Sequence, residues 1–176
     1  SAAKKIPVVI ATTGFDDDQK KQIENAATKN GVFFTYNMSL GINLLATLAK
    51  KAVDVLGNDF DIEIIEKHHN QKIDAPSGTA LMLADAICEE IDKPMKYEYD
   101  RHSKREKRSK NEIGMHAVRG GTIVGEHEII FAGRDEIITL SHSARSKEIF
   151  AVGAVNAAKY MVGKGAGLYT MKDLIK

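Results

Sequence analysis

Residues 61–91 read DIEIIEKHHNQKIDAPSGTALMLADAICEEI and join a strand, a turn and a helix in immediate succession. The run DIEIIEKHH predicts a strand whose end delivers two adjacent histidines, His68 and His69. Pro76 then fixes the backbone, and a helix is expected to begin just after it, with Ser77 as its N-cap. A histidine pair, a cation at Lys72 and a helix N-terminus therefore fall within one short segment.

The segment before this one predicts a strand, a helix and a second strand. IPVVIATTGF (6–15) is a short buried strand that ends in a Thr-Thr-Gly turn, and DDDQKKQIENAATKNG (16–31) is a helix with acidic residues in its first turn. VFFTYN (32–37) is again typical of a strand. This order favours a parallel sheet with a crossover helix.

The next segment, SLGINLLATLAKKAVDVLGN (39–58), predicts an amphipathic helix that ends at Gly57. The residues expected to share its apolar face are Ile42, Leu45, Leu48, Ala49 and Val53.

After a basic stretch at 101–110, the sequence predicts three strands over 114–144, with turns at 120–121 and 132–135. The basic stretch has no interleaved apolar or aromatic residue, which favours a solvated loop. An apolar helix follows in 147–165. The fold class expected is α/β (α+β): part of a Rossmann-like parallel sheet, plus a middle domain with an open mixed sheet of about four strands and two helices.

Composition excludes little but favours a cytoplasmic location. The 176 residues are 43% hydrophobic and 28% charged with a net charge of +1, so whole-molecule charge gives no argument for nucleic acid or an acidic membrane as a partner. No apolar run approaches the roughly 20 residues that cross a bilayer. The first residues, SAAKKIPVV, lack the layout of a secretion signal.

The side chains between 66 and 80 suit the binding and protonation of a small anion. His68 can exchange a proton near neutral pH, and Lys72 supplies a positive charge. The backbone N–H groups of Gly78 and Thr79, at the start of a helix, form a site for a carboxylate. The segment therefore predicts a proton donor, a cation and an anion site within reach of one small acid.

Three other interpretations stay open on the residues alone. The histidine pair can be a surface or structural feature, and Ser-Gly-Thr after proline can be a plain helix cap. A metal site would use His68 or His69 with Glu66 and Asp74. Adjacent histidines at a strand end diverge, however, and no second cluster of cysteine or histidine has ligand spacing, so no metal is expected.

The run E-x-H-H-x-x-K-x-D-A-P-S-G-T-A at 66–80 resembles the signature of the dihydrodipicolinate reductase family. Four further segments resemble that family in the same order. They are ATTGFD (11–16), YNMSLGIN (36–43), EIGMHAVRGGTIVGEHEIIFAG (112–133) and ITLSHSARSKEIFAVGAVNAA (138–158). The likeness covers nearly the whole chain.

The resemblance implies roles for individual residues. His68 matches the general acid/base, Lys72 the other catalytic group, and His69, Gly78 and Thr79 the positions that hold substrate carboxylates. The cofactor, NADPH or NADH, would contact Ala11, Thr12, Thr13, Thr35, Tyr36, Asn37 and Met38. The implied reaction is hydride transfer to the ring of a cyclic dicarboxylate imine, dihydrodipicolinate, completed by protonation, in the diaminopimelate route to lysine.

The resemblance also implies a domain plan and a homotetramer assembled through the sheet of the middle domain. Residues 1–39 would be part of the dinucleotide-binding domain, 40–148 the substrate-binding and oligomerisation domain, and 149–176 the return to the first domain. No Gly-rich phosphate loop precedes Ile6, so we expect the chain to lack the first half of its cofactor domain and to turn over poorly. Lys147 stands where many family members have arginine, and neither it nor Arg145 is assigned a role. The alternative is a non-catalytic binding or assembly module that keeps the family sheet.

Overall fold

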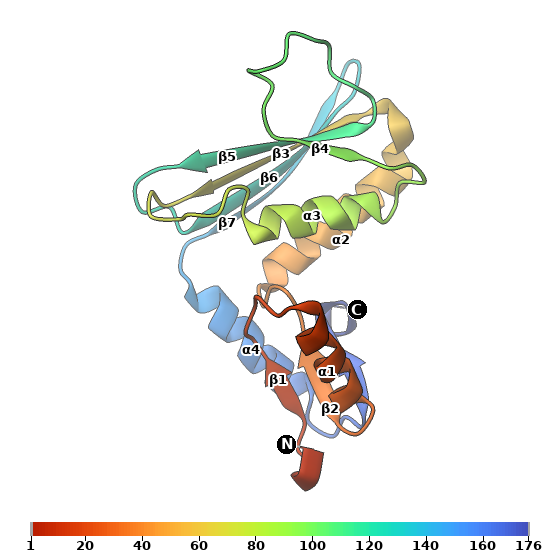
Figure 1. The fold of residues 1–176 in the computed structure, drawn as a ribbon, viewed down its shortest axis with the longest axis vertical. Coiled ribbons are helices and arrows are strands. Elements are labelled where there is room, and N and C mark those ends of the chain that lie inside the picture. Colours follow the sequence, from red (N-terminus) through yellow and green to blue (C-terminus); the bar gives the residue numbers. More distant parts are fainter. Residues whose placement is uncertain (1, 176) are drawn as a thin grey trace. The chain divides into compact units, whose positions relative to one another are not determined.

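The structure, a computed structural model, describes residues 2–175, which form two compact units (Figure 1). One unit combines the residues up to Asn43 with those from Lys147 onward, and the other is Leu44–Ser146. The elements of the first unit are η1 (Ala2–Lys4), β1 (Val8–Ile10), α1 (Asp17–Ala27), β2 (Gly31–Phe34), α4 (Glu148–Tyr160), β8 (Gly167–Tyr169) and α5 (Met171–Leu174).

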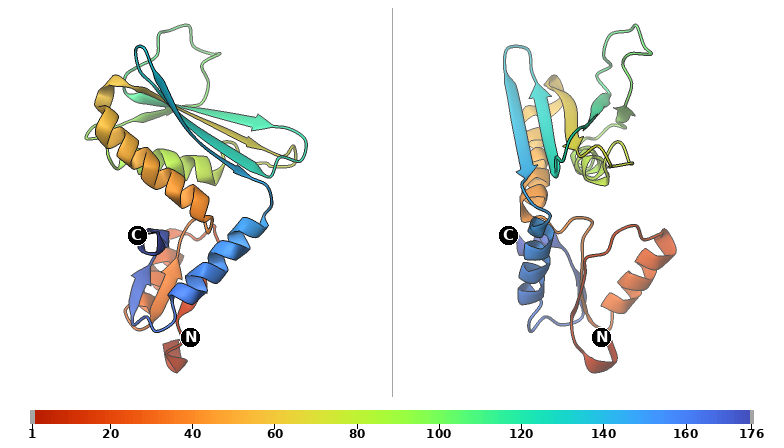
Figure 2. Two further views of the ribbon diagram at one scale, coloured as in Figure 1. Left: turned by 180° about the vertical axis from the view of Figure 1, so that it is seen from behind. Right: turned by 90° about the vertical axis from the view of Figure 1, so that its left-hand side faces the viewer.

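The first unit is a three-stranded parallel sheet in the order β1-β2-β8. Successive side chains of a strand point to opposite faces, so Val32 and Phe33 of β2 enter different cores. Val32 packs with Ile23 and Ala27 of α1, whereas Phe33 packs with Ala157 of α4. The two helices therefore cover opposite faces of this sheet, as Figure 2 also shows.

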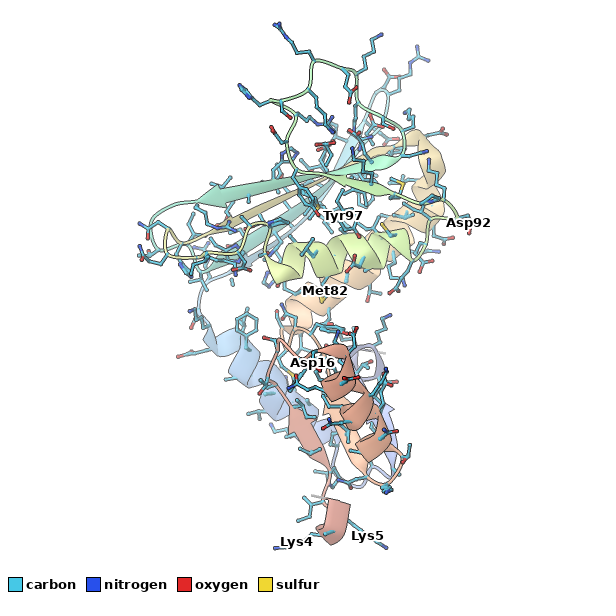
Figure 3. All side chains as sticks on the ribbon, in the orientation of Figure 1. Lys4, Lys5, Asp16, Met82, Asp92 and Tyr97 are labelled. Carbon is cyan, nitrogen blue, oxygen red and sulfur yellow. The ribbon has the colours of Figure 1, made fainter. Side chains whose placement is uncertain are left out.

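Helix α1 begins where the sequence places an acidic cap. The Asp16 carboxylate accepts a hydrogen bond from the backbone N–H of Gln19 at 2.8 Å, and the Gln19 side chain accepts one from the Asp16 backbone at 3.0 Å. Figure 3 labels Asp16 at the start of this helix. This reciprocal pair satisfies two backbone donors that the helix leaves free, and it fixes the turn between β1 and α1.

The second unit is a five-stranded mixed sheet in the order β4-β5-β3-β6-β7. Two helices, α2 and α3, pack on one face of it (Figure 1), and their apolar residues form one core with those of β3, β5 and β6. The bounds are α2 (Leu40–Leu56, shared with the first unit), η2 (Gly57–Asp59), β3 (Asp61–His68), α3 (Gly78–Cys88), β4 (Lys96–Glu98), β5 (Glu112–Arg119), β6 (Gly125–Ala132) and β7 (Ile137–Ala144).

The predicted α/β fold with a parallel sheet and a mixed sheet is confirmed, but two details of it differ. The edge strand β4 was not predicted: it has only three residues, although the stretch around it, MKYEYD (95–100), alternates between apolar and polar side chains. Leu48, which was expected on the buried face of α2, is 46% exposed, whereas Leu45 and Ala49 are buried. Gly57 does end α2, and its φ of +62° is the conformation that glycine adopts most easily.

The turn at 120–121 does not form a hairpin between adjacent strands. β5 pairs parallel with one side of β3, and β6 pairs antiparallel with the other side. The connection between them therefore crosses the end of β3, where the Gly120 N–H donates to the His68 carbonyl at 2.9 Å and the Asn70 N–H donates to the Gly121 carbonyl at 3.2 Å. The turn at 132–135 does join the neighbouring antiparallel strands β6 and β7.

The basic stretch is an irregular loop with most of its residues exposed, as predicted, but three of its cations are tied to the sheet. Arg108 lies 2.9 Å from the Glu63 carboxylate and 3.1 Å from that of Asp61. Arg101 pairs with both Glu63 and Glu112, and Lys104 pairs with Glu98. Asp61 and Glu63 come from β3, which is too far away in the sequence for a local pattern to reveal these pairs, whereas Glu98 of β4 and Glu112 of β5 flank the loop. Among the described residues, no helix has the length and apolar character needed to span a membrane.

Substitution of Gly153 in α4 tests the packing of this helix within the first unit. A Cβ at this position would lie 1.8 Å from the backbone oxygen of Met38, so we expect Gly153→Ala to lower the free energy of unfolding by about 1–3 kcal/mol. Gly165→Ala is the control, because a Cβ there meets nothing within 4 Å. Urea denaturation of both variants measures the effect. Equal midpoints would contradict the described packing of α4.

Candidate functional site

The side chains singled out by sequence gather where β3 ends and α3 begins. His68 is the last residue of β3 and is buried, whereas His69 follows it and is partly exposed. Ser77 is the N-cap of α3, and its hydroxyl oxygen accepts a hydrogen bond from the Ala80 N–H at 3.2 Å, as predicted. Gly78 and Thr79 are the first two residues of the helix.

A fully buried carboxylate, Glu66, lies at the centre of this region. Arg119 of β5 reaches both of its oxygens, at 2.7 and 2.8 Å, and the Ser77 N–H donates to it at 3.0 Å. The Nδ1 atom of His68 lies 2.5 Å from the carboxylate. Burial alone would raise the pKa of Glu66, but the hydrogen bonds from Arg119 and His68 outweigh it, and the pKa is below its ordinary value. Glu66 is therefore ionised at neutral pH.

A second histidine, His127 of β6, contacts the same helix cap. Its Nε2 atom lies 3.1 Å from the Ser77 hydroxyl oxygen, and its ring is 5.2 Å from that of His68 in an edge-on arrangement. Burial, followed by the nearby His68, lowers the pKa of His127 to about 4. His127 is therefore neutral at pH 7. Its Nδ1 atom is buried and finds no hydrogen-bond partner within the described part of the chain.

Lys72 reaches the same helix end through an acidic neighbour. Its Nζ atom lies 2.8 Å from the Asp74 carboxylate, which also accepts a hydrogen bond from the backbone of Gly78. Lys72 is the main cause of the lowered pKa of Asp74. A carboxylate at this spot therefore contacts both the cation and the helix amide that the sequence analysis named.

The structure thus brings His68, Lys72 and Gly78 to one helix N-terminus. Sequence reasoning missed Arg119 and His127, which come from other strands and enter the site only through strand pairing. Of the two backbone amides expected to bind a ligand carboxylate, that of Gly78 already binds Asp74 of the chain itself, and the neighbouring Ser77 amide binds Glu66. Within residues 2–175, no group of three or more His, Cys, Asp and Glu side chains gathers as a metal site would require.

The residues predicted to contact a cofactor lie in two loops of the first unit. Ala11, Thr12 and Thr13 follow β1 and are exposed. Thr35–Met38 follow β2; there Met38 is buried, and the Asn43 side chain donates to the Asn37 carbonyl at 2.7 Å. Because β1 and β2 are parallel neighbours, both loops leave the same edge of the sheet. That edge is where open α/β sheets bind nucleotides.

Comparisons with known proteins agree on one family. The family models described as dihydrodipicolinate reductase, N-terminus, and dihydrodipicolinate reductase, C-terminus, match residues 1–38 and 41–175. A protein of Caldanaerobacter subterraneus subsp. tengcongensis named 4-hydroxy-tetrahydrodipicolinate reductase is 58% identical over 176 residues, which are 100% of this chain and 70% of the relative. A protein of Clostridium novyi with the same name is 52% identical and is covered over 69% of its length.

A solved structure of the same family shares the fold. It is titled as a dipicolinate-bound dihydrodipicolinate reductase from a Paenisporosarcina species, and it matches with a TM-score of 0.74 at 29% identity. The match covers 96% of this chain and 64% of that one. The chain therefore spans about two thirds of the length of the proteins it resembles.

The buried, neutral His127 predicts how stability depends on pH. Its pKa is about 4 in the folded chain and about 6.5 when unfolded, so the unfolded chain binds more protons between these values. The stability contributed by His127 is complete above pH 6.5 and is lost as the pH falls towards 4, by up to about 3 kcal/mol.

Urea denaturation from pH 7 to pH 4.5 measures this loss. We expect His127→Gln, which does not titrate, to have a flatter pH dependence than the unsubstituted chain. His102→Gln, which replaces an exposed histidine, is the control and should keep the full dependence. Parallel curves for the unsubstituted chain and His127→Gln would show that His127 is not buried in its neutral form.

Proposed function

Because the chain belongs to the dihydrodipicolinate reductase family, we propose that it takes part in the reduction of a cyclic dicarboxylate imine by NADPH or NADH. Reductases of this family use either dinucleotide. The observation that carries the proposal is the Asp74 carboxylate, held by Lys72 and the Gly78 backbone. It supports this helix end as a carboxylate site, which a dicarboxylate substrate needs.

His68 and Lys72 divide the catalytic work in this proposal. Lys72 offsets the negative charge of the substrate, and His68 donates the proton that completes the reduction. The backbone of Gly78 and Thr79, together with His69, holds the substrate carboxylates. Since Asp74 is largely exposed, a carboxylate of the substrate can take its place beside Lys72 and Gly78.

When bound, the cofactor supplies the hydride. We propose that the loops after β1 and β2 contact it. Three facts support them: they follow neighbouring parallel strands, one of them is exposed, and both lie in the segment that matches the N-terminal family model. The assignment of residues 40–148 to substrate and assembly, the homotetramer and the cytoplasmic location stay predictions.

Calorimetric titration with pyridine-2,6-dicarboxylate tests the substrate site. We expect binding to the unsubstituted chain and at least about a tenfold loss of affinity in Lys72→Ala, because one charge-assisted contact is worth about 1.5–3 kcal/mol. Lys67→Ala is the matched control: this lysine lies in β3, a few residues before the turn that carries Lys72, and pairs with Glu126 at 3.3 Å, so its loss should leave affinity unchanged.

Two outcomes would contradict the proposed site. If Lys72→Ala and the unsubstituted chain bind pyridine-2,6-dicarboxylate with equal affinity, Lys72 is not part of the site. If neither the dicarboxylate nor NADPH binds, the chain is better described as an assembly module that keeps the family sheet.

A further inference from the structure

We propose that Glu66, held by Arg119, is a positioning residue that keeps the neutral His68 ring protonated at Nδ1, so that Nε2 is the nitrogen that exchanges a proton with the substrate. This inference rests on the role proposed for His68 and adds what selects the reacting atom. Neither Glu66 nor Arg119 has a part in the roles proposed above, although Glu66 is the most completely buried charged group near His68.

The first step is the ionisation of Glu66. Its carboxylate accepts two hydrogen bonds from Arg119 and one from the Ser77 backbone. These donors keep the negative charge in place although the side chain has no access to water. An ionised carboxylate can only accept hydrogen bonds, so the His68 Nδ1 atom at 2.5 Å must be the donor.

The second step concerns the other ring nitrogen. With the proton on Nδ1, neutral His68 carries its free electron pair on Nε2. Gly125 of β6 lies beside this atom: a Cβ at that position would come within 3.1 Å of Nε2. The glycine therefore keeps space open next to the nitrogen that is proposed to react.

The third step is the double role of Arg119. Besides holding Glu66, its guanidinium donates to the backbone carbonyl of Asp74 at 2.6 Å. Asp74 pairs with Lys72, so one arginine fixes both the carboxylate that orients His68 and the loop that carries Lys72. A lysine at this position could not make these contacts together, because its single ammonium lacks the planar fork.

The proton transfer balances without a change at Glu66. A bound dinucleotide would supply the hydride, and the part of His68 is the proton: the N–H bond at Nε2 of protonated His68 breaks. The electron pair stays on Nε2, the proton goes to the reduced ring, and His68 is left as the Nδ1–H form that Glu66 already favours. Glu66 keeps its charge throughout and does not take up a proton.

Nitrogen-15 NMR of the labelled chain above pH 8 reads the protonation of each histidine ring nitrogen directly. We expect His68 to carry its proton on Nδ1. In Glu66→Gln an amide faces Nδ1, so the Nδ1–H population should fall several-fold. Arg119 can still donate to the Asp74 carbonyl in this variant, so the affinity for pyridine-2,6-dicarboxylate should fall by a smaller factor than the Nδ1–H population does.

Glu63→Gln is the matched control. Glu63 lies on the same strand and its carboxylate is 2.7 Å from Nε2 of His116, so this variant should change the His116 signals and leave those of His68 alone. A His68 proton on Nε2 in the unsubstituted chain would overturn the proposal even if Glu66→Gln fails to fold. Unchanged His68 signals in a folded Glu66→Gln would overturn it as well.

The dicarboxylate titration separates this proposal from the function on which it rests. If the unsubstituted chain shows the Nδ1–H form but binds no dicarboxylate, the proposed function fails while the role of Glu66 in setting the ring proton is supported. If it binds the dicarboxylate but carries the His68 proton on Nε2, the function is supported and the role of Glu66 is overturned.

Discussion

The ion pair between the buried Glu66 and the partly buried Arg119 is the interaction on which the rest of the site depends. A carboxylate without access to water is costly unless hydrogen-bonded cations compensate it, and removing one partner of such a pair typically costs about 3–5 kcal/mol. Here the pair joins β3 to β5, the Ser77 backbone joins it to α3, and the Asp74 carbonyl joins it to the loop between them. One charge pair thus fixes the elements that carry His68, Lys72 and Gly78.

Two carboxylates of the chain bind the first amides of α3, and their burial separates their roles. The Glu66 side chain is 1% exposed and accepts from Ser77, whereas the Asp74 side chain is 57% exposed and accepts from Gly78. The buried one is held by a bidentate arginine and belongs to the framework. The exposed one is paired with a single lysine, and surface pairs of this kind contribute little stability, so a ligand carboxylate can replace it at small cost.

The sequence predicted those features that local patterns determine. The Ser77 cap, the end of α2 at Gly57 and the strand that ends at His68 follow from residues a few positions apart. Arg119 and His127 could not be found in this way, because they reach the site through β5 and β6 pairing with the two sides of β3. The same pairing explains why the turn at Gly120 crosses the end of β3 instead of joining neighbours. The catalytic roles came from resemblance and stay predictions until they are measured.

The charge of Glu66 is the most direct test of this account. Carbon-13 NMR can follow the Glu66 carboxyl carbon from pH 7 to pH 3 in the folded chain. We predict that the signal keeps the position of a carboxylate at pH 4.5, the ordinary pKa of glutamate, and changes only below it. A carboxyl that is already half protonated at pH 4.5 or above would mean that Arg119 does not compensate the burial, and the proposed organisation of the site would be wrong.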